Sequence, residues 1–83
     1  MKLLYFAWLR QRIGKGEEDI APAPPAQNVA ELIDWLKARG PGYAAAFADP
    51  KLVRAAVNQV HVKFDAPIAA GDEVAFFPPV TGG

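Results

Sequence analysis

The most hydrophobic segments of the chain lie at its two ends. "KLLYFAW" (Lys2–Trp8) and "EVAFF" (Glu73–Phe77) are short apolar runs rich in aromatic residues. Runs of this length and composition are typical of strands near the middle of a sheet or covered on both faces. We expect both segments to be such strands. Pro78 and Pro79 should end the second one, because they lack the backbone N–H that a ladder needs.

Between these ends, one segment has a helical pattern. Apolar residues at i, i+3, i+4 and i+7 predict one buried stripe: Val29, Leu32, Ile33 and Leu36. Asn28 is suited to the N-cap position, and Glu31 stands three residues later, as a capping box requires. Gly40 is expected to end this helix and Pro41 to prevent its restart. "YAAAF" (Tyr43–Phe47) is expected to add one more helical turn.

The remaining strands have weaker patterns. "EEDIAPA" (17–23) carries charges and a proline, which suit an edge strand, and we expect it to form a hairpin with the first strand around Gly14 and Gly16. "LVRAAVN" (52–58) and "QVHVKF" (59–64) predict two further strands, with a turn where they meet.

This order of strand, strand, helix and further strands predicts the fold class. It indicates an α+β domain with one mixed sheet and one main helix packed across one face. With the first and last strands side by side at the centre, this is the β-grasp, or ubiquitin-like, arrangement. We expect residues 1–77 to form this domain and residues 78–83 to form a flexible C-terminal tail that ends in Gly-Gly.

Composition narrows the classes of function. Lysine plus arginine and aspartate plus glutamate each number 9 in 83 residues, which argues against nucleic acid as the main partner. The absence of cysteine excludes disulfides and thiol nucleophiles and fits the cytoplasm. No run approaches the ~20 apolar residues of a membrane span. Because 52% of the residues are hydrophobic, more than a small domain can bury, we expect an exposed apolar patch.

The chain offers little side-chain chemistry. His61 is the only histidine, and the sequence supplies neither a second acid–base group for it nor a carboxylate at metal-ligand spacing. We therefore expect no catalytic side chain and no metal site. If Val60 and Val62 face the core, His61 and Lys63 face outward. Glu17–Asp19 lacks the spacing of a calcium loop and is interpreted as a solvated strand end.

The last strand is predicted to show one aromatic residue to solvent. Phe76 and Phe77 are adjacent, so they face opposite sides of the sheet. Val74 is in phase with Phe76, and we assign both of these inward and Phe77 outward. An exposed Phe77 beside His61 would make a hydrophobic docking patch.

The final segment, "PPVTGG", ends in a backbone without side chains. Six residues reach at most about 20 Å when extended, and the prolines stiffen the start of the segment. Thr81, Gly82 and Gly83 are slender enough to enter a narrow channel of another protein. The terminal α-carboxylate is ionised at neutral pH. It is a poor acyl donor until it is adenylated, after which it can accept sulfur as a thiocarboxylate or acylate a lysine.

The sequence resembles the family of small, sulfur-carrier subunits of molybdopterin synthase. The resemblance is strongest in "AAVNQ" (55–59) and "GDEVAFFPPVTGG" (71–83), and it is looser in the opening strand and "LRQRIG". It implies that an E1-like adenylating enzyme uses ATP to adenylate Gly83 and that a sulfur-donor system converts the adenylate to a thiocarboxylate. The tail would then enter the large synthase subunit, where sulfur passes to cyclic pyranopterin monophosphate.

The resemblance also assigns roles to single residues. It implies that the tail entering the partner comprises Pro78, Pro79, Val80, Thr81 and Gly82, with Gly83 as the modified residue. Phe77 matches an exposed aromatic of the docking surface, and Phe6 matches a second one, while His61 stands where a more apolar residue would suit the patch. The implied complex is a heterotetramer. Its catalytic side chains belong to the large subunit, so this chain is a non-catalytic sulfur donor without a bound cofactor.

Three other functions remain open at this stage. The first is a sulfur carrier of thiamine biosynthesis, against which "FFPPVTGG" argues. The second is a donor for tRNA thiolation or a ubiquitin-like modifier of lysines. The third is a plain interaction module whose tail has no chemical role.

Overall fold

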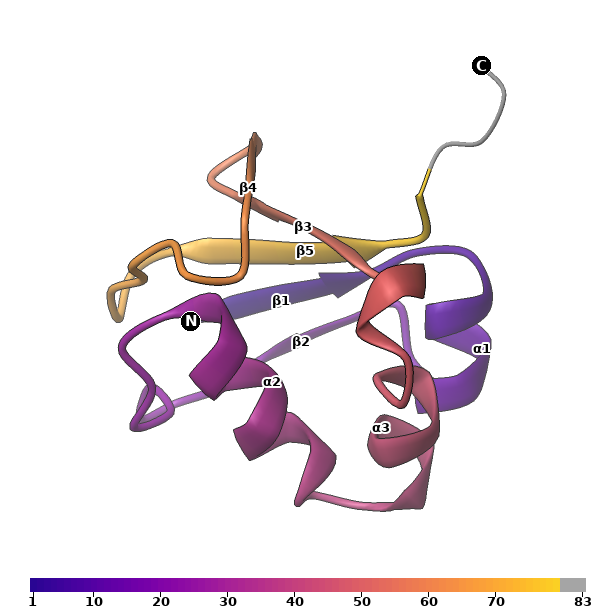
Figure 1. The fold of residues 1–83 in the computed structure, drawn as a ribbon. Helices are drawn as coiled ribbons and strands as arrows, with labels where there is room; N and C mark the ends of the chain where they lie inside the picture. Colours follow the sequence, from indigo (N-terminus) through magenta and orange to yellow (C-terminus); the bar gives the residue numbers. More distant parts are fainter. Residues whose placement is uncertain (80–83) are drawn as a thin grey trace.

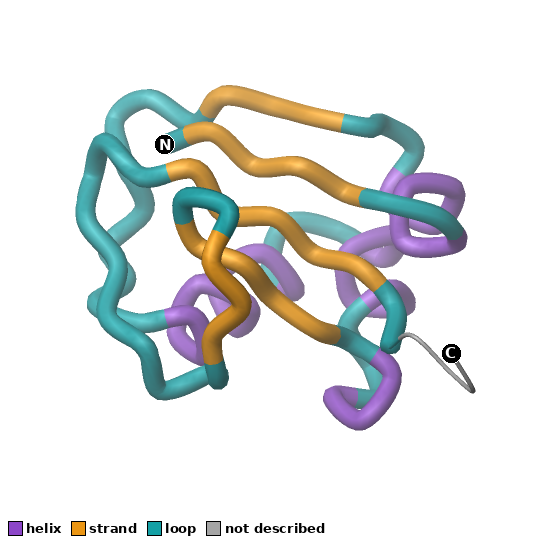
Figure 2. Tube along the Cα trace, turned by 90° about the horizontal axis from the view of Figure 1, so that it is seen from above, coloured by secondary structure: helices purple, strands orange, loops and turns teal. Residues whose placement is uncertain are grey.

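The computed structural model describes residues 1–79 as one mixed sheet with helices packed against one face (Figures 1 and 2). The strands are β1 (Lys2–Tyr5), β2 (Glu17–Asp19), β3 (Arg54–Val57), β4 (Val60–Val62) and β5 (Glu73–Phe77). The helices are α1 (Trp8–Ile13), α2 (Val29–Lys37), α3 (Pro41–Ala46) and the short 3-10 helix η1 (Pro50–Leu52). The strand order is β2-β1-β5-β3-β4. This is the predicted α+β, β-grasp arrangement. No helix within residues 1–79 is long and apolar enough to cross a membrane.

The first and last strands pair at the centre of the sheet, as predicted. β1 runs parallel to β5, with Leu3 opposite Val74 and Tyr5 opposite Phe76. All four of these side chains are buried. The Tyr5 and Phe76 rings stack with centroids 6.3 Å apart. Both strands are interior to the sheet, and their inward residues fill the core, which accounts for the apolar character of these two segments.

Helix α2 forms where the periodicity predicts it. Its four stripe residues are buried: Val29, Leu32, Ile33 and Leu36. The Oδ1 atom of Asn28 accepts a hydrogen bond from the Glu31 backbone N–H at 2.8 Å. The Glu31 side chain accepts in turn from the backbone N–H of Gln27 at 2.9 Å, one residue before the N-cap of an ideal capping box. The predicted start of the helix at Asn28 is therefore confirmed, but the Glu31 side chain bonds to the backbone N–H of Gln27 instead of Asn28.

The predicted tight hairpin between the first two strands is wrong. β1 ends at Tyr5, and α1 occupies Trp8–Ile13 before β2 begins. Ala7 adopts a left-handed backbone (φ 56°) that turns the chain out of the strand, and Gly14 ends the helix with φ 92°. β1 and β2 still pair antiparallel, and β2 is an edge strand as predicted.

Pro41 begins a helix instead of preventing one. It stands at the first turn of α3, where its missing N–H has no intrahelical partner to lose. The next residue, Gly42, packs against α1. A Cβ atom there would lie 2.6 Å from the carbonyl oxygen of Arg12, so this contact between the helices requires glycine.

The β3–β4 hairpin has the predicted turn. Asn58 and Gln59 both adopt left-handed backbone (φ 51° and 69°), which suits a two-residue hairpin turn. β3 begins at Arg54 instead of Leu52, because Pro50–Leu52 forms η1. Val60 lies opposite Val57 and in phase with Val62, so it faces the helix side of the sheet as considered, but it is 63% exposed because it lies on an edge strand. β4 is a three-residue edge strand, and its Val62 is the valine that packs against the core.

One carboxylate joins the edge strand β2 to the core and the helices. The Glu18 side chain is 10% exposed. It accepts hydrogen bonds from the Tyr5 hydroxyl at 2.7 Å, the Tyr43 hydroxyl at 2.6 Å and the Arg39 guanidinium at 2.9 Å. Desolvation acts to raise the pKa of Glu18, but the hydrogen bonds from Tyr43, Tyr5 and Arg39 outweigh it and hold that pKa below its usual value. Glu17–Asp19 is therefore not merely a solvated strand end, as the sequence suggested.

We expect Glu18→Gln to lower the free energy of unfolding by about 1–3 kcal/mol at neutral pH, because hydrogen bonds to a charged acceptor are strong. A carboxyl whose pKa is lowered by folding adds stability above its unfolded pKa, and that stability is lost as the pH falls through the lowered folded pKa. Urea denaturation from neutral to strongly acidic pH should therefore show a weaker pH dependence in Glu18→Gln than in the wild type.

Glu17→Gln is the matched control for this measurement. Its side chain is 67% exposed and contacts Lys2 at 3.5 Å, an arrangement worth about 0–1 kcal/mol. If the free energy of unfolding of Glu18→Gln falls with decreasing pH as steeply as that of the wild type, the role assigned to Glu18 is contradicted.

Candidate functional site

The face of the sheet opposite the helices is the first part of the candidate site. Along β5, Val74 and Phe76 are buried toward the helices, and the alternate residues point the other way. Phe77 lies opposite Arg54 on β3, and Ala56 lies opposite both Ala75 and His61. The strands β5, β3 and β4 lie side by side (Figure 2). Opposed residues share a face, so the open face collects side chains from all three.

Aromatic side chains gather at the end of this face where β5 ends. The rings of His61 and Phe77 lie with centroids 5.0 Å apart. Phe6 follows β1, and its backbone N–H donates to the Phe76 carbonyl at 3.1 Å, which places it next to the end of β5. Phe6 is 49% exposed and Phe77 is half-buried. The predicted facing of Phe76 and Phe77 is confirmed, and Phe77 does lie beside His61; their role in docking stays a prediction.

The tail begins at this aromatic end of the sheet. Pro78 and Pro79 directly follow Phe77, lie outside the strand and are half-buried. Neither can donate a backbone hydrogen bond, which stops the ladder there. Val80, Thr81, Gly82 and Gly83, the remaining predicted tail residues, lie outside the described residues.

The described residues form no evident catalytic constellation. His61 is exposed, and its nearest aromatic neighbour is Phe77, not a carboxylate or hydroxyl that would position it as an acid or base. Within residues 1–79, no group of three histidine, aspartate or glutamate side chains is placed to hold a metal ion. This end of the molecule carries an exposed aromatic surface, formed by Phe6, His61 and Phe77, next to the start of the tail.

Helix α1 is the part of this region that was not predicted. Trp8 was expected in a strand, whereas it begins a helix that lies beside the end of β5 (Figure 1). The signal was present: Leu9 and Ile13 are four residues apart, and Gly14 follows as a helix-ending glycine. The apolar run that continues from β1 into "FAWL" hid this short helix.

Comparison with known proteins gives a consistent picture. The model of the ThiS family matches residues 3–83. The molybdopterin synthase sulfur carrier subunit of Escherichia coli K12 is 46% identical over 83 residues, covering 100% of this chain and 99% of the relative.

Two solved structures share the fold over nearly the whole chain. The structure of a putative molybdopterin converting factor, subunit 1, from Pyrococcus furiosus has a TM-score of 0.73 and 35% identity, covering 95% of each chain. The structure of SAMP1 from Haloferax volcanii has a TM-score of 0.76 and 27% identity, covering 100% of this chain and 98% of the other.

The two adjacent phenylalanines of β5 provide a test of the site geometry. Phe76 is 0% exposed and packs edge-on against Phe47 at 4.9 Å, so Phe76→Ala should cost about 3–5 kcal/mol of unfolding free energy. Phe77→Ala removes a half-buried ring from the open face and should cost about 1 kcal/mol. Urea denaturation of both variants measures the difference. Equal losses would show that Phe77 is a core residue and not a surface for docking.

Proposed function

This chain belongs to the ThiS family, and from that membership we propose that it is a sulfur carrier subunit of molybdopterin synthase in the biosynthesis of the molybdenum cofactor. The full-length likeness to the Escherichia coli sulfur carrier subunit supports this assignment. One structural observation carries it: the aromatic end of the open sheet face adjoins the point where "PPVTGG" leaves the domain. A partner that binds this face is thereby placed to receive the tail.

The working group is the α-carboxylate of Gly83. An E1-like enzyme activates it: a carboxylate oxygen attacks the α-phosphorus of ATP, pyrophosphate leaves, and an acyl adenylate forms. Sulfide supplied by the donor system then attacks the acyl carbon and displaces AMP, which leaves the sulfur on Gly83 as a C-terminal thiocarboxylate. The domain holds no cofactor of its own in this scheme, since ATP is consumed by the adenylating enzyme.

The charged carrier then delivers its sulfur inside the large synthase subunit. The tail enters that subunit, and the thiocarboxylate sulfur passes to cyclic pyranopterin monophosphate, with two transfers for each pterin. We propose a heterotetramer of two small and two large subunits. The carrier positions the thiocarboxylate, because the six residues from Pro78 onward can carry it at most about 20 Å from the domain. The large subunit contributes the catalytic side chains.

The division of the chain supports this role. Residues 1–77 supply the docking surface, with Phe77, His61 and Phe6 as its proposed contacts, and residues 78–83 act as the tail. Gly82 lies next to the modified Gly83 and, like Thr81 and Val80, would occupy a narrow channel. Glycine suits such a channel because no side chain limits the approach of the partner.

The first test is chemical charging of the C-terminus. The purified chain is incubated with an E1-like adenylating enzyme, ATP and a sulfur source, and its C-terminal peptide is weighed by mass spectrometry. We expect a mass gain that corresponds to the exchange of oxygen for sulfur on Gly83, and no gain in a variant that lacks Gly83. An unmodified terminus, under conditions that charge the Escherichia coli carrier, would overturn the proposal.

The same variant separates carriage of sulfur from modification of proteins. If the chain acts as a ubiquitin-like modifier, cell extracts should contain conjugates of higher mass that disappear when Gly83 is deleted. Their presence, without loss of molybdopterin synthesis in the deletion strain, would favour that second function.

The second test concerns docking. Phe77→Ala should weaken binding to the large synthase subunit by about tenfold or more, because aromatic residues at the centre of an interface commonly carry its binding energy. Isothermal titration calorimetry measures the dissociation constant. Val60→Ala is the matched control, since Val60 is 63% exposed but lies on the edge strand β4 away from the open face. Equal affinities for the two variants would remove Phe77 from the interface.

A further inference from the structure

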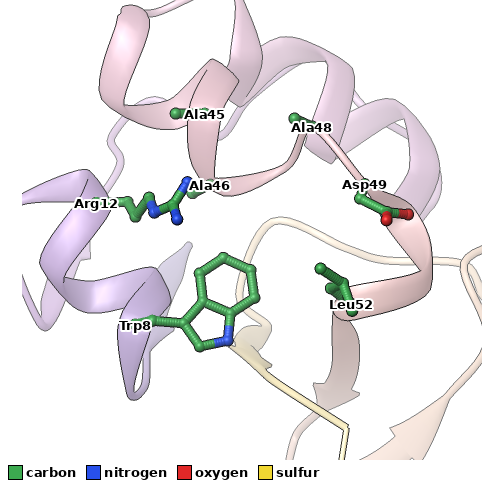
Figure 3. Close-up of a pocket in the computed structure, with 7 residues that line it drawn as sticks. All are labelled: Trp8, Arg12, Ala45, Ala46, Ala48, Asp49 and Leu52. Atoms are coloured by element: carbon green, nitrogen blue, oxygen red, sulfur yellow. The ribbon is translucent and has the colours of Figure 1, made fainter.

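A cleft of about 350 Å³ opens between α1 and the segment that runs from α3 into η1. In Figure 3, Trp8 and Leu52 lie on opposite sides of the cleft, Arg12 lies above Trp8, and the upper side is formed by three alanines: Ala45, Ala46 and Ala48. Leu52 is 50% exposed and Trp8 is half-buried, so the cleft presents apolar surface from two elements rather than from one isolated side chain. None of the roles assigned above uses this cleft.

The cleft lies beside the start of the tail because of the sheet order. β5 is flanked by β1 and β3. Trp8 follows the end of β1, which runs parallel to β5, and Leu52 precedes β3, which runs antiparallel to it. The end of β5 is therefore bordered by the two elements that carry Trp8 and Leu52 (Figure 1). A protein that takes in the tail must approach this place.

The charge at this end of the molecule is positive. Five exposed cations lie in or next to α1, η1, β3 and β4: Arg10, Arg12, Lys51, Arg54 and Lys63. The ion pairs found among residues 1–79 use other cations: the N-terminal amine, Lys2, Lys15 and Arg39. No acidic residue occurs within α1, η1, β3 or β4. The acidic residues Asp19 and Glu73 instead lie at the opposite end of the central strands.

Within the cleft, Arg12 is available to an anion. Its guanidinium carbon lies 5.5 Å from the centre of the Trp8 ring, a cation–π contact that orients the group but does not neutralise it. Asp49 also lines the cleft, but its carboxylate accepts from the Lys51 backbone N–H at 3.0 Å and points away from Arg12 in Figure 3. A guanidinium held against an aromatic ring is suited to bind a carboxylate with two hydrogen bonds.

We infer that this cleft receives an acidic segment of the protein that takes in the tail, with an apolar side chain between Trp8 and Leu52 and a neighbouring carboxylate on Arg12. The inference rests on the proposed function, since it takes the tail-receiving protein to be the large synthase subunit. The cleft extends the aromatic docking surface around the start of the tail. Phe77 and Phe6 supply contacts on the sheet face, and the cleft fixes the orientation of the domain.

Charge reversal in the cleft tests the inference. Arg12→Glu should weaken binding to the large synthase subunit by about tenfold or more, because it sets a carboxylate against a carboxylate. It should also reduce the salt dependence of binding, since one attractive pair is lost. Lys37→Glu is the matched control, because it makes the same charge change on an exposed residue of α2 and should leave the affinity within about twofold. Thermal melts confirm that both variants are folded.

A second variant identifies the occupant. Acidic residues of the large subunit are replaced by arginine one at a time, and one of these changes should restore binding to Arg12→Glu, as a direct contact requires. If Arg12→Glu binds as tightly as Lys37→Glu, or if no reversal in the partner rescues it, the cleft is not an interface with an acidic segment.

These measurements distinguish a failure of the cleft inference from a failure of the proposed function. If Phe77→Ala weakens the complex while Arg12→Glu does not, the docking surface stands and the cleft has no part in it. If the unmodified chain binds no large subunit, the proposed function fails, and the inference fails with it.

Discussion

The parallel pairing of β1 and β5 is the contact on which the rest of the structure depends. It joins the two ends of the sequence, with Leu3 opposite Val74 and Tyr5 opposite Phe76. Each fully buried side chain of this kind contributes about 1.5–3 kcal/mol. Parallel neighbours cannot be joined by a tight turn, so the chain needs a long connection between them, and here that connection includes the helices and the β3–β4 hairpin. The same pairing brings Phe6 to the end of β5 and sets α1 beside the start of the tail.

This central pair also separates the two faces of the molecule. Toward the helices, Tyr5, Phe76 and Phe47 form a buried aromatic core, and the Tyr5 hydroxyl at its margin donates a hydrogen bond to Glu18. Burial and the bond to Glu18 raise the pKa of Tyr5, so the hydroxyl stays protonated and keeps donating. On the other face, the residues in alternate register remain accessible. Because β5 is fixed on one side by the core, the residues that follow it leave the domain from a defined place, which is what a partner needs in order to capture them.

The sequence predicted the long-range order better than the local path. The apolar runs at the two ends, the stripe of α2 and the Asn58-Gln59 turn each follow from a single physical rule, and each is confirmed. The short helix α1 was harder to predict, since its local signal is only the spacing of Leu9 and Ile13 before Gly14, and its first residues continue the apolar run of β1. Its formation depends on Gly42, which lets α3 approach the Arg12 backbone, and such a contact between distant segments leaves no local pattern. The facing of Phe77 was predictable because strand alternation has period two, whereas the cleft at Trp8 depended on the helix that was missed.

Charge is distributed unevenly between the two ends of the central strands. The formal net charge of the chain is zero, yet five of its nine lysine and arginine residues lie where the tail begins, while Asp19 and Glu73 lie at the far end of the central strands. A molecule with zero net charge and separated charges feels little long-range electrostatic attraction to a partner, but the field of the partner orients it as the two approach. For a carrier this is an advantage, because it has to present one end to each protein that handles its tail and then leave. An apolar patch provides affinity without direction, while separated charges provide direction with little affinity. The chain has both at the same end, and its chemistry requires that end to arrive first.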